Sequence, residues 1–318
     1  MEIVYRLFNS DTDYPRRAEI INRTARNQSP MTADRLRAID LEQPSDLFQQ
    51  LIVATDGNRH MLGFSRILQP PWYSAGDMYQ VIRVDPEFQR RGIGTGLYER
   101  LLTAARQTQT KRLFADVADY LPDELVFAER RGFQIDRHMF ESRLDVANFD
   151  ETPFAKVVDT VSMTGITFTT LAALGDTPEN RQKLYELHQR LATDVPGDEH
   201  PTFASLESFE LSLLPNSRAL PEAVILALAD DQWIGFTALT SFGDPNTLNH
   251  FMTGVNRHFR GRNLAMAMKL LSIQYAKLHS IRYLETNNDS TNAPMLAINA
   301  KLGYQRLRGV YTLIKSLS

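Results

Sequence analysis

The chain has 318 residues, of which 43% are hydrophobic, and is therefore long enough for two domains with separate cores. Its formal net charge of -3 is too small in magnitude, and of the wrong sign, for a general nucleic-acid-binding surface. It contains no cysteine, which excludes disulfides, thiolate metal ligands and a cysteine nucleophile. No apolar run reaches the ~20 residues that span a bilayer, and the amino terminus lacks the layout of a signal peptide. We therefore expect a cytoplasmic monomer or homodimer with no nucleic-acid or membrane partner.

In the first half of the chain, hydrophobic periodicity and turn residues predict alternating strands and helices. Two of the strands flank Asp56-Gly57-Asn58, turn chemistry that predicts a hairpin. The expected strands are 3–8, 50–55, 61–68, 77–84, 112–117 and 140–146, and the expected helices are 14–28, 32–39, 44–49, 95–107 and 122–131.

The second half repeats this order after a segment, 147–163, that shows no clear period and is expected to link the halves. Its expected strands are 166–171, 224–229, 233–241, 248–255, 282–286 and 309–316, and its expected helices are 179–193, 203–214, 264–279 and 294–302. The inward face of the helix at 264–279 is expected to carry Ala265, Met268, Leu271 and Tyr275.

A glycine-rich turn joins the strand at 77–84 to the helix at 95–107, an arrangement that places backbone N–H groups and the positive end of a helix dipole at one point. Gly92 and Gly94 allow an anion to approach the backbone closely. The run is not a P-loop, because Gly-x-x-x-x-Gly-Lys-Ser/Thr is absent. It is not a dinucleotide fingerprint either, because Leu97 stands where the third glycine belongs.

Gln89, Gly92 and Gly94 fill the pattern Gln/Arg-x-x-Gly-x-Gly/Ala, with Val84 upstream at the end of the strand. This resembles the pyrophosphate loop of the Gcn5-related N-acetyltransferases (GNAT), which bind acetyl-coenzyme A. The alternative is a strand-to-helix turn that needs glycine for its conformation alone.

The same landmarks return in the second half at a nearly constant offset. Val255 and the run from Arg260 to Ala265 repeat Val84 and the first loop, and Lys301-Leu302-Gly303-Tyr304 repeats Arg130-Arg131-Gly132-Phe133 at the same offset. Gly235-Phe236 echoes Gly63-Phe64 at an offset only one position longer. The resemblance therefore implies two tandem GNAT folds, 1–150 and 160–318. Each would be an α/β fold with a mixed, mostly antiparallel sheet splayed between its fourth and fifth strands.

The resemblance also implies the residues that hold acetyl-coenzyme A. In the first half these are Arg83, Val84, Gln89, Arg90, Arg91, Gly92, Ile93, Gly94 and Thr95, and in the second half Val255, Arg260, Gly261, Arg262, Asn263, Leu264, Ala265 and Asn292. Asn263 departs from the pattern, because it replaces the first loop glycine. Its side chain would either crowd the pyrophosphate or cap the following helix.

Acetyl transfer to an amine needs a base for the amine and a proton for the leaving thiolate. Many family members carry a tyrosine acid shortly before the glycine of the Gly-Phe pair, and here Ala128 and Asn299 stand at that place. Tyr120 is a substitute acid in the first half. His250, or Glu199 with His200, could act as the base, since histidine titrates near neutral pH.

The polar run around Asn288, Asn292 and Asn299 resembles the C-terminal halves of mycothiol-synthase-like tandem acetyltransferases. We therefore expect an acetyl-coenzyme A-dependent N-acetyltransferase that acts on a primary amine of a small molecule by direct transfer in a ternary complex. The second half would do the chemistry with His250, Asn288, Asn299 and Glu199. The alternative is a non-catalytic acyl-coenzyme A binding or sensing protein, since both tyrosines are missing.

Overall fold

The computed structural model describes residues 2–24, 30–42, 44–71, 73–194, 203, 205–213 and 220–317. The chain divides into two compact units, of which unit 1 comprises Met1–Asp136 with Tyr311–Ser318 and unit 2 comprises Arg137–Val310. This division differs from the expected ranges 1–150 and 160–318, because residues 137–150 lie in unit 2 and residues 311–318 lie in unit 1. In the described part of the chain no helix is long and apolar enough to cross a membrane.

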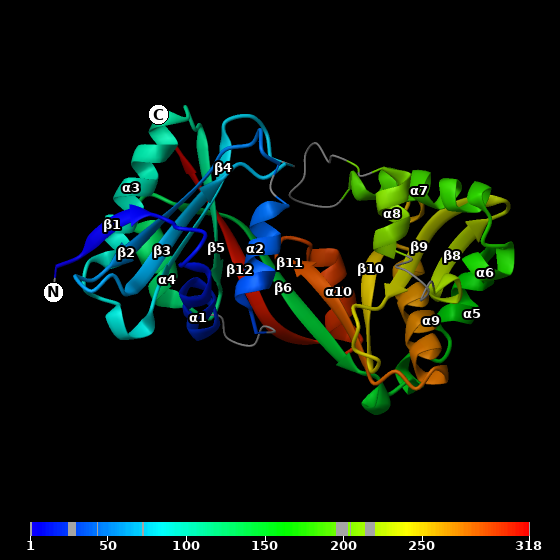
Figure 1. The fold of residues 1–318 in the computed structure, drawn as a ribbon. Helices are drawn as coiled ribbons and strands as arrows, with labels where there is room; N and C mark the ends of the chain where they lie inside the picture. Colours follow the sequence, from blue (N-terminus) through cyan, green and yellow to red (C-terminus); the bar gives the residue numbers. More distant parts are fainter. Residues whose placement is uncertain are drawn as a thin grey trace. The chain divides into compact units, whose positions relative to one another are not determined.

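Unit 1 is built on a sheet with the strand order β1-β2-β3-β4-β5-β12 (Figure 1). Its strands are β1 Val4–Leu7, β2 Gln49–Thr55, β3 Met61–Leu68, β4 Asp77–Val84, β5 Arg112–Ala118 and the last part of β12 Gln305–Ser316. Its helices are α1 Tyr14–Thr24, α2 Ala33–Leu41, α3 Ile93–Gln107 and α4 Pro122–Glu129, with a 3-10 turn η1 at Pro86–Phe88.

Unit 2 has the strand order β6-β11-β10-β9-β8-β7 (Figure 1). Its strands are β6 Gln134–Asp145 from Arg137 on, β7 Ile166–Thr170, β8 Val224–Ala229, β9 Gln232–Thr240, β10 Thr247–Val255, β11 Tyr283–Asp289 and the first part of β12 up to Val310. Its helices are α5 Val157–Ser162, α6 Leu171–Leu174, α7 Pro178–Ala192, α8 Leu206–Leu213, α9 Leu264–Leu278 and α10 Ala293–Lys301. Its 3-10 turns are η2 Val146–Asn148, η3 Thr152–Phe154, η4 Pro221–Ala223 and η5 Arg257–Phe259.

The strands of each unit separate at the same place in the sheet. β4 pairs with β5 in parallel only from Asp77 to Tyr79, although β4 continues to Val84. β10 pairs with β11 in parallel only from Thr247 to His250, although β10 continues to Val255. The other neighbouring strands from β1 to β4 and from β7 to β10 are antiparallel. The predicted fold class, a mostly antiparallel sheet splayed between its fourth and fifth strands, is confirmed.

Strand alternation places helices on both faces of each sheet. In unit 1, Ile20 of α1 packs with Val53 and Phe64, whereas Leu97 of α3 packs with Ala54 and Leu62. In unit 2, α7 and α8 pack on Leu226 and Phe236, and α9 packs on the opposite face with Ile225, Ala227 and Ile234. The loops before α3 and α9 therefore lie on matching faces of the two units.

Three expectations about local structure are wrong. Residues 44–49 are not helical, because the chain turns at Pro44 and β2 begins at Gln49. Residues 147–163 do not link the two units: they lie inside unit 2 and hold most of η2, η3 and α5, which are too short to show a hydrophobic period. On α9 only Met268 of the four expected inward residues is fully buried, because α5 packs on this helix from a second side and burial extends to Leu264, Ala267 and Lys269.

The hairpin glycines of both units contact the strand that leads to the loop. A Cβ at Gly63 would lie 2.7 Å from the carbonyl oxygen of Arg83, and one at Gly235 would lie 2.8 Å from the carbonyl oxygen of Gly254. We expect Gly63→Ala to lower the free energy of unfolding of unit 1 by about 1–3 kcal/mol, because backbone must move. Gly57→Ala is the control, since a Cβ there meets no atom within 4 Å. Equal chemical denaturation midpoints for the two variants would contradict the close approach.

Candidate functional site

The loop between β4 and α3 leaves an uncapped helix N-terminus. The buried Asp85 side chain accepts a hydrogen bond from the Glu87 N–H at 3.0 Å, and Gln89 Nε2 donates to the Val84 carbonyl at 3.2 Å. The backbone then turns through left-handed conformations at Arg90 (φ 61°) and Gly92 (φ 80°). Gly92 is the N-cap of α3 and makes no side-chain capping bond, so no side chain satisfies the first N–H groups of this helix.

The loop between β10 and α9 follows the same path with different residues. Asn256 accepts from the His258 N–H at 3.1 Å, and Arg260 Nε donates to the Val255 carbonyl at 3.0 Å. Gly261 (φ 77°) and Asn263 (φ 59°) take the left-handed conformations of Arg90 and Gly92. Asparagine tolerates this conformation better than most residues, so the missing glycine does not alter the turn. Asn263 is the N-cap of α9, but its side chain makes no capping bond.

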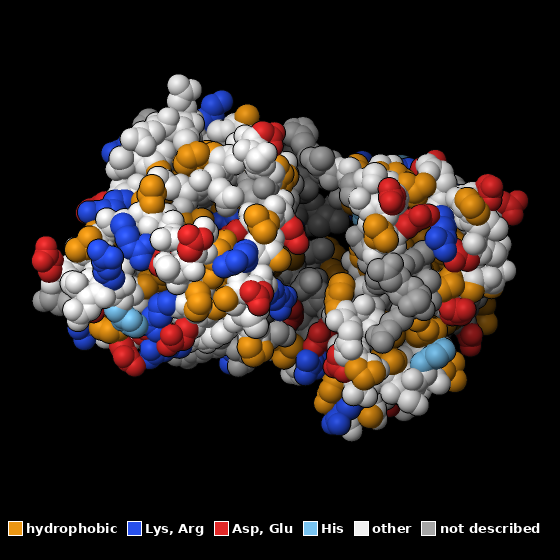
Figure 2. Space-filling model, viewed as in Figure 1, with side chains coloured by type: hydrophobic (Ala, Val, Ile, Leu, Met, Phe, Trp, Pro, Cys, Tyr) orange, Lys and Arg blue, Asp and Glu red, His pale blue; other side chains and the backbone are white. Residues whose placement is uncertain are grey.

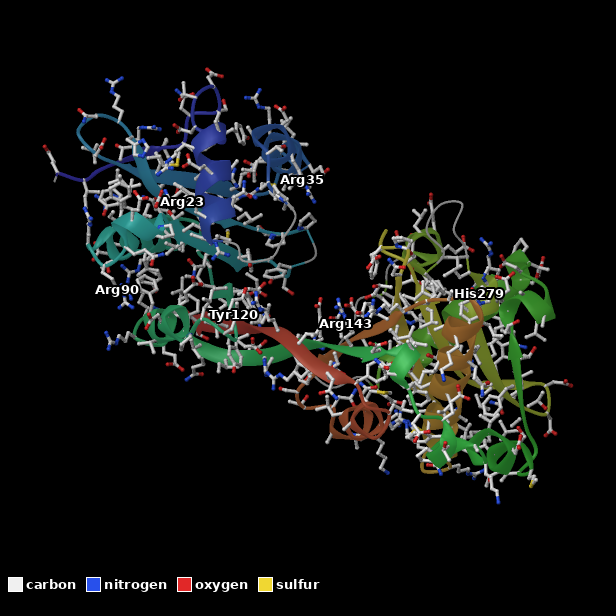
Figure 3. All side chains as sticks on the ribbon, turned by 90° about the horizontal axis from the view of Figure 1, so that it is seen from below. Arg23, Arg35, Arg90, Tyr120, Arg143 and His279 are labelled. Atoms are coloured by element: carbon white, nitrogen blue, oxygen red, sulfur yellow. The ribbon has the colours of Figure 1, made fainter. Side chains whose placement is uncertain are left out.

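Both loops fit a phosphate-bearing group. Each ends in the uncapped N-terminus of a helix, where N–H groups and the dipole favour an anion. A Cβ at Gly92 or at Gly261 would meet no atom within 4 Å, so the space in front of each backbone is open. Arg90, labelled in Figure 3, reaches Asp123 at 2.6 Å with both side chains exposed, an ion pair that is readily exchanged for another anion.

The remaining predicted loop residues have mixed roles. Ile93 and Leu264 are buried core residues, Val84 and Ala265 are half-buried, and Gly94 lies against Phe127 of α4. Thr95 accepts a hydrogen bond from Arg131 at 2.7 Å. Among the cations, the half-buried Arg83 lies 3.8 Å from Glu124, and the exposed Arg91 and Arg262 lie over Phe88 and Phe259. Asn292 is not at the loop: it is the N-cap of α10 and accepts from the Met295 N–H at 3.4 Å.

Unit 2 contains a buried basic cluster on the α9 face of its sheet. His250 Nε2 lies 2.8 Å from the Tyr304 hydroxyl, and His250 Nδ1 lies 3.4 Å from Thr237 Oγ1. Lys269 of α9 has no exposed surface, and its Nζ has no hydrogen-bond partner but lies 4.7 Å from the centre of the Tyr304 ring.

Burial sets the charge of this cluster. It lowers the pKa of Lys269 to about 7 and raises the pKa of Tyr304. The pKa of His250 falls well below its usual value through burial and the nearby Lys269 charge.

A chain of buried amides lies beside the cluster. Asn299 Nδ2 donates to Asn288 Oδ1 at 2.7 Å, and Asn288 Nδ2 donates to Ser142 Oγ at 2.9 Å and to the Thr286 carbonyl at 3.2 Å. Asn299 Oδ1 has no partner. Thr286 is the residue opposite His250 in the last pair before β10 and β11 separate. The structure thus brings the predicted His250, Asn288 and Asn299 to the point where the sheet opens.

The sequence analysis missed Lys269 and Tyr304. A signal was present, because Lys269 falls directly after Met268 in the expected buried helix, and Tyr304 follows the second Gly landmark. Glu199 and His200 lie outside the described residues. Tyr120 lies between β5 and α4 (Figure 3). No group of His, Asp and Glu side chains in the described ranges could hold a metal ion.

Unit 1 has the same fold without this cluster. At the repeat offset that relates Val255 to Val84, the counterparts of Thr286, Asn288, Asn299, Tyr304 and Lys269 are Ala115, Val117, Ala128, Phe133 and Tyr98, all of them buried. All but one of these are apolar, and the exception, Tyr98, is satisfied by a hydrogen bond from Lys315 at 2.8 Å. The counterpart of His250 is the half-buried Tyr79, which donates a hydrogen bond to Asp116 at 3.1 Å. The buried polar groups of unit 2 are therefore not required to build the fold, and they cost stability because buried polar groups must be desolvated.

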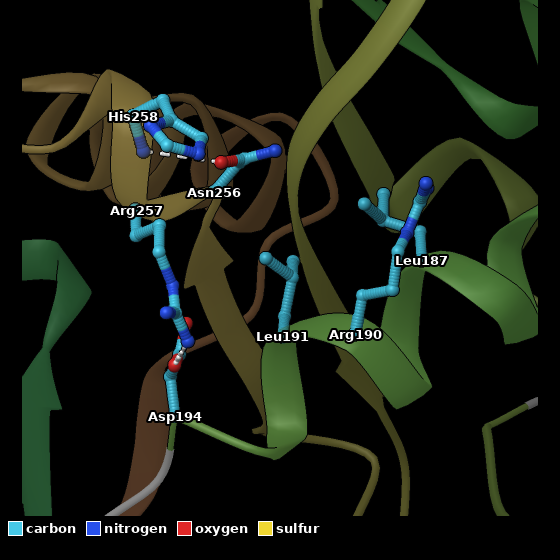
Figure 4. Close-up of a pocket in the computed structure, with 7 residues that line it drawn as sticks. All are labelled: Leu187, Arg190, Leu191, Asp194, Asn256, Arg257 and His258. Atoms are coloured by element: carbon cyan, nitrogen blue, oxygen red, sulfur yellow. Dashed lines mark hydrogen bonds and ion pairs between the residues drawn. The ribbon is translucent and has the colours of Figure 1, made fainter.

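A cavity of about 320 Å³ lies beside the second loop (Figure 4). Asp194 bridges Arg257 (2.6 Å) and Arg260 (2.7 Å) at its edge, which ties the end of α7 to the loop. The cavity is lined by Leu187, Arg190, Leu191, Asp194, Asn256, Arg257 and His258.

In each unit a mostly antiparallel sheet opens beside a loop that fits a phosphate-bearing group. Residues 6–133 match the sequence model of the acetyltransferase (GNAT) family, a family of acyltransferase enzymes. A search of curated proteins finds no match.

Solved structures with the same fold cover nearly the whole chain. A GCN5-related N-acetyltransferase from Sphaerobacter thermophilus is 18% identical, with 99% of this chain and 95% of that chain covered and a TM-score of 0.64. A tandem GNAT protein from the clavulanic acid biosynthesis pathway is 20% identical, with 99% and 98% covered and a TM-score of 0.62. The glucosamine N-acetyltransferase region of a fungal multi-domain GH3 β-N-acetylglucosaminidase is 16% identical, with 98% of this chain but 38% of that chain covered and a TM-score of 0.67. At these identities the likeness establishes the tandem GNAT fold.

Proposed function

We propose that the chain is an acetyl-coenzyme A-dependent N-acetyltransferase for a primary amine of a small molecule, and that unit 2 carries the chemistry. The observation that carries this proposal is the buried polar cluster at the opening of the unit 2 sheet, on the α9 face that also holds the second loop. Unit 1, which matches the family model, has the same loop and no such cluster. It would bind coenzyme A without transferring the acetyl group.

The loops would hold coenzyme A through backbone N–H groups of Gly92, Ile93 and Gly94 in unit 1 and of Asn263, Leu264 and Ala265 in unit 2. When bound, acetyl-coenzyme A supplies an activated thioester. Direct transfer in a ternary complex fits a chain without cysteine, because the commonest covalent acyl carrier is missing. His250, Asn288 and Asn299 would line the reacting end in unit 2.

The distribution of surface charge does not favour a nucleic-acid acceptor. Basic and acidic side chains are interspersed on the face of each unit drawn in Figure 2, in keeping with the net charge of -3. A nucleic-acid-binding face would instead gather basic side chains. We propose that the protein acts in the cytoplasm without a nucleic-acid partner.

A second candidate is a non-catalytic acyl-coenzyme A sensor. It is favoured by one observation: Ala128 and Asn299 stand where a tyrosine acid is expected, and neither side chain can supply a titrating proton. Thiol release from acetyl-coenzyme A across a panel of amines separates the candidates. Tight binding of coenzyme A without turnover on any amine would establish the sensor.

A matched pair of variants assigns the chemistry to a unit. An aspartate at a loop N-cap places a negative charge against the incoming phosphate, so we expect Asn263→Asp to lower kcat/KM for acetyl-coenzyme A by roughly 10-fold or more. We expect Gly92→Asp to remove coenzyme A binding by unit 1 in calorimetry while turnover stays within about twofold. Gly92→Asn, which copies the residue of the second loop, is the control. Loss of turnover in Gly92→Asp but not in Asn263→Asp would place the chemistry in unit 1.

A further inference from the structure

We propose that the cavity between α7 and the second loop of unit 2 binds a small dicarboxylate, at a site separate from the coenzyme A that the loop would hold. At the matching place unit 1 has two carboxylates of its own, each paired with an arginine, whereas unit 2 has a free arginine and neither carboxylate. The ligand completes in unit 2 a contact that unit 1 makes within its own chain. The inference does not depend on acetyl transfer by either unit.

In unit 1 two acids close the contact between the helix and the first loop. Arg23 of α1 donates to the buried Asp85 at 2.9 Å and to Glu87 at 2.6 Å, so that one guanidinium holds two carboxylates. Arg16 of the same helix also donates to Asp85. Because the Asp85 side chain has no exposed surface, its charge requires these basic partners.

Unit 2 has neither acid at this place. At the repeat offset, the counterparts of Asp85 and Glu87 are Asn256 and His258. Arg190 of α7 lines the same cavity as these two residues, yet its side chain has no ion pair with any residue that the structure describes. The two residues that supply negative charge in unit 1 are therefore replaced by neutral side chains that can donate hydrogen bonds.

The polar groups around the cavity call for an anion. Asn256 Oδ1 accepts from the His258 N–H at 3.1 Å, which leaves the amide nitrogen, and Figure 4 shows this nitrogen pointing away from His258. Among the lining residues Asp194 is the one carboxylate, and Arg257 pairs with it at 2.6 Å. Arg190 thus adds a positive charge that no lining carboxylate balances.

The shape of the cavity favours a ligand with two acidic ends. One wall is α7, which supplies Arg190 above Leu187 and Leu191, and the other wall is the η5 turn with its donors (Figure 4). A volume of about 320 Å³ is ample for a short dicarboxylate that reaches both walls. A guanidinium binds a carboxylate with directed, charge-assisted hydrogen bonds, so Arg190 would hold one end.

The position of the cavity separates this ligand from the amine acceptor. His250 marks the opening of the sheet, and Asn256 follows it by six residues, which span roughly 20 Å of extended strand. An alkylammonium would also be repelled by the unbalanced charge of Arg190. The dicarboxylate is therefore a second ligand of unit 2, not the group that receives the acetyl.

Succinate is the probe for this site. We expect it to bind the full-length protein in calorimetry and to raise the urea midpoint of unit 2, which buried Trp233 reports in a Trp72→Phe background. Sodium chloride at equal ionic strength controls for screening. We expect Arg190→Gln to weaken succinate binding by roughly 10-fold or more. Arg262→Gln removes an exposed loop charge that does not line the cavity, so we expect a change within about twofold.

A double variant copies unit 1 and tests the same idea without a ligand. We expect Asn256→Asp with His258→Glu to pair with Arg190, to abolish succinate binding and to raise the urea midpoint of unit 2 above that of the ligand-free wild type. The turn should still form, because unit 1 forms it with these residues.

Three results would overturn the inference. They are an absence of succinate binding, succinate binding that both Arg190→Gln and the double variant retain, and binding of inorganic phosphate without binding of succinate. A failure of the proposed function is distinguishable from these, because a protein that acetylates no amine would still bind succinate and respond to the variants.

Discussion

A chain that ends at Val310 should fail to fold unit 1. Residues 311–318 belong to that unit, where the end of β12 lies beside β5. Leu313 is fully buried in the core with Leu101 and Leu113. The segment also supplies a hydrogen bond from Thr312 to Asp116 at 2.9 Å, and the deletion would expose the edge of β5. We expect hydrogen exchange to show lost protection in β4, β5 and α3 and retained protection in β8, β9 and α9.

A single substitution in the same segment tests its contribution to the stability of unit 1. We expect Leu313→Ala to lower the free energy of unfolding of unit 1 by roughly 3 kcal/mol, the usual cost of truncating a fully buried leucine. Val310→Ala in the same strand is the control: Val310 is 40% exposed and lies in unit 2, so the change should stay within about 0.5 kcal/mol. Equal effects of the two substitutions on unit 1 would show that the end of β12 does not complete its core.

The strand ends also mark the limit of sequence analysis. Alternation predicts strands at 140–146 and 309–316, and the structure has β6 and β12 there. It does not predict their partners, because pairing depends on contacts between residues far apart in the chain. The expected domains, 1–150 and 160–318, place each strand in its own half. Instead β6 pairs with β11 from Asp145 opposite Tyr283 to Met139 opposite Asp289, and the end of β12 joins unit 1.

The candidate site also has one part that the sequence predicts and one part that it does not. The loops are local, since a strand, left-handed turn residues and a helix start follow one another in sequence, and the pattern predicts them well. The basic cluster is assembled from β10, α9 and a tyrosine shortly after α10, which no spacing rule connects. Lys269 was passed over because a lysine in a helix ordinarily faces solvent. Only the structure shows α5 and the sheet covering both sides of α9.

The stability of unit 2 should rise with pH in the wild type and not in Lys269→Met. The pKa of this lysine falls from 10.5 in the unfolded chain to about 7 in the fold. Below pH 7 it is protonated in both states, and the full cost of the buried charge applies. Between pH 7 and 10 the unfolded chain binds more protons, so the free energy of unfolding rises by about 1.4 kcal/mol per pH unit, or roughly 4 kcal/mol in total.

The neighbouring titratable groups add little to the pH dependence of the free energy of unfolding between pH 7 and 10. The pKa of His250 is lowered in the fold, so the change that it causes in the free energy of unfolding is complete near pH 7. The pKa of Tyr304 is raised, so the change that it causes begins above pH 10. Buried Trp233 lies in unit 2 and reports its unfolding in urea, with Trp72→Phe removing the only other tryptophan. Subtracting the free energy of unfolding of Lys269→Met from that of the wild type at each pH isolates the contribution of the lysine. A difference that stays flat from pH 7 to 10 would mean that Lys269 keeps an ordinary pKa, because water or a carboxylate reaches it in the native protein.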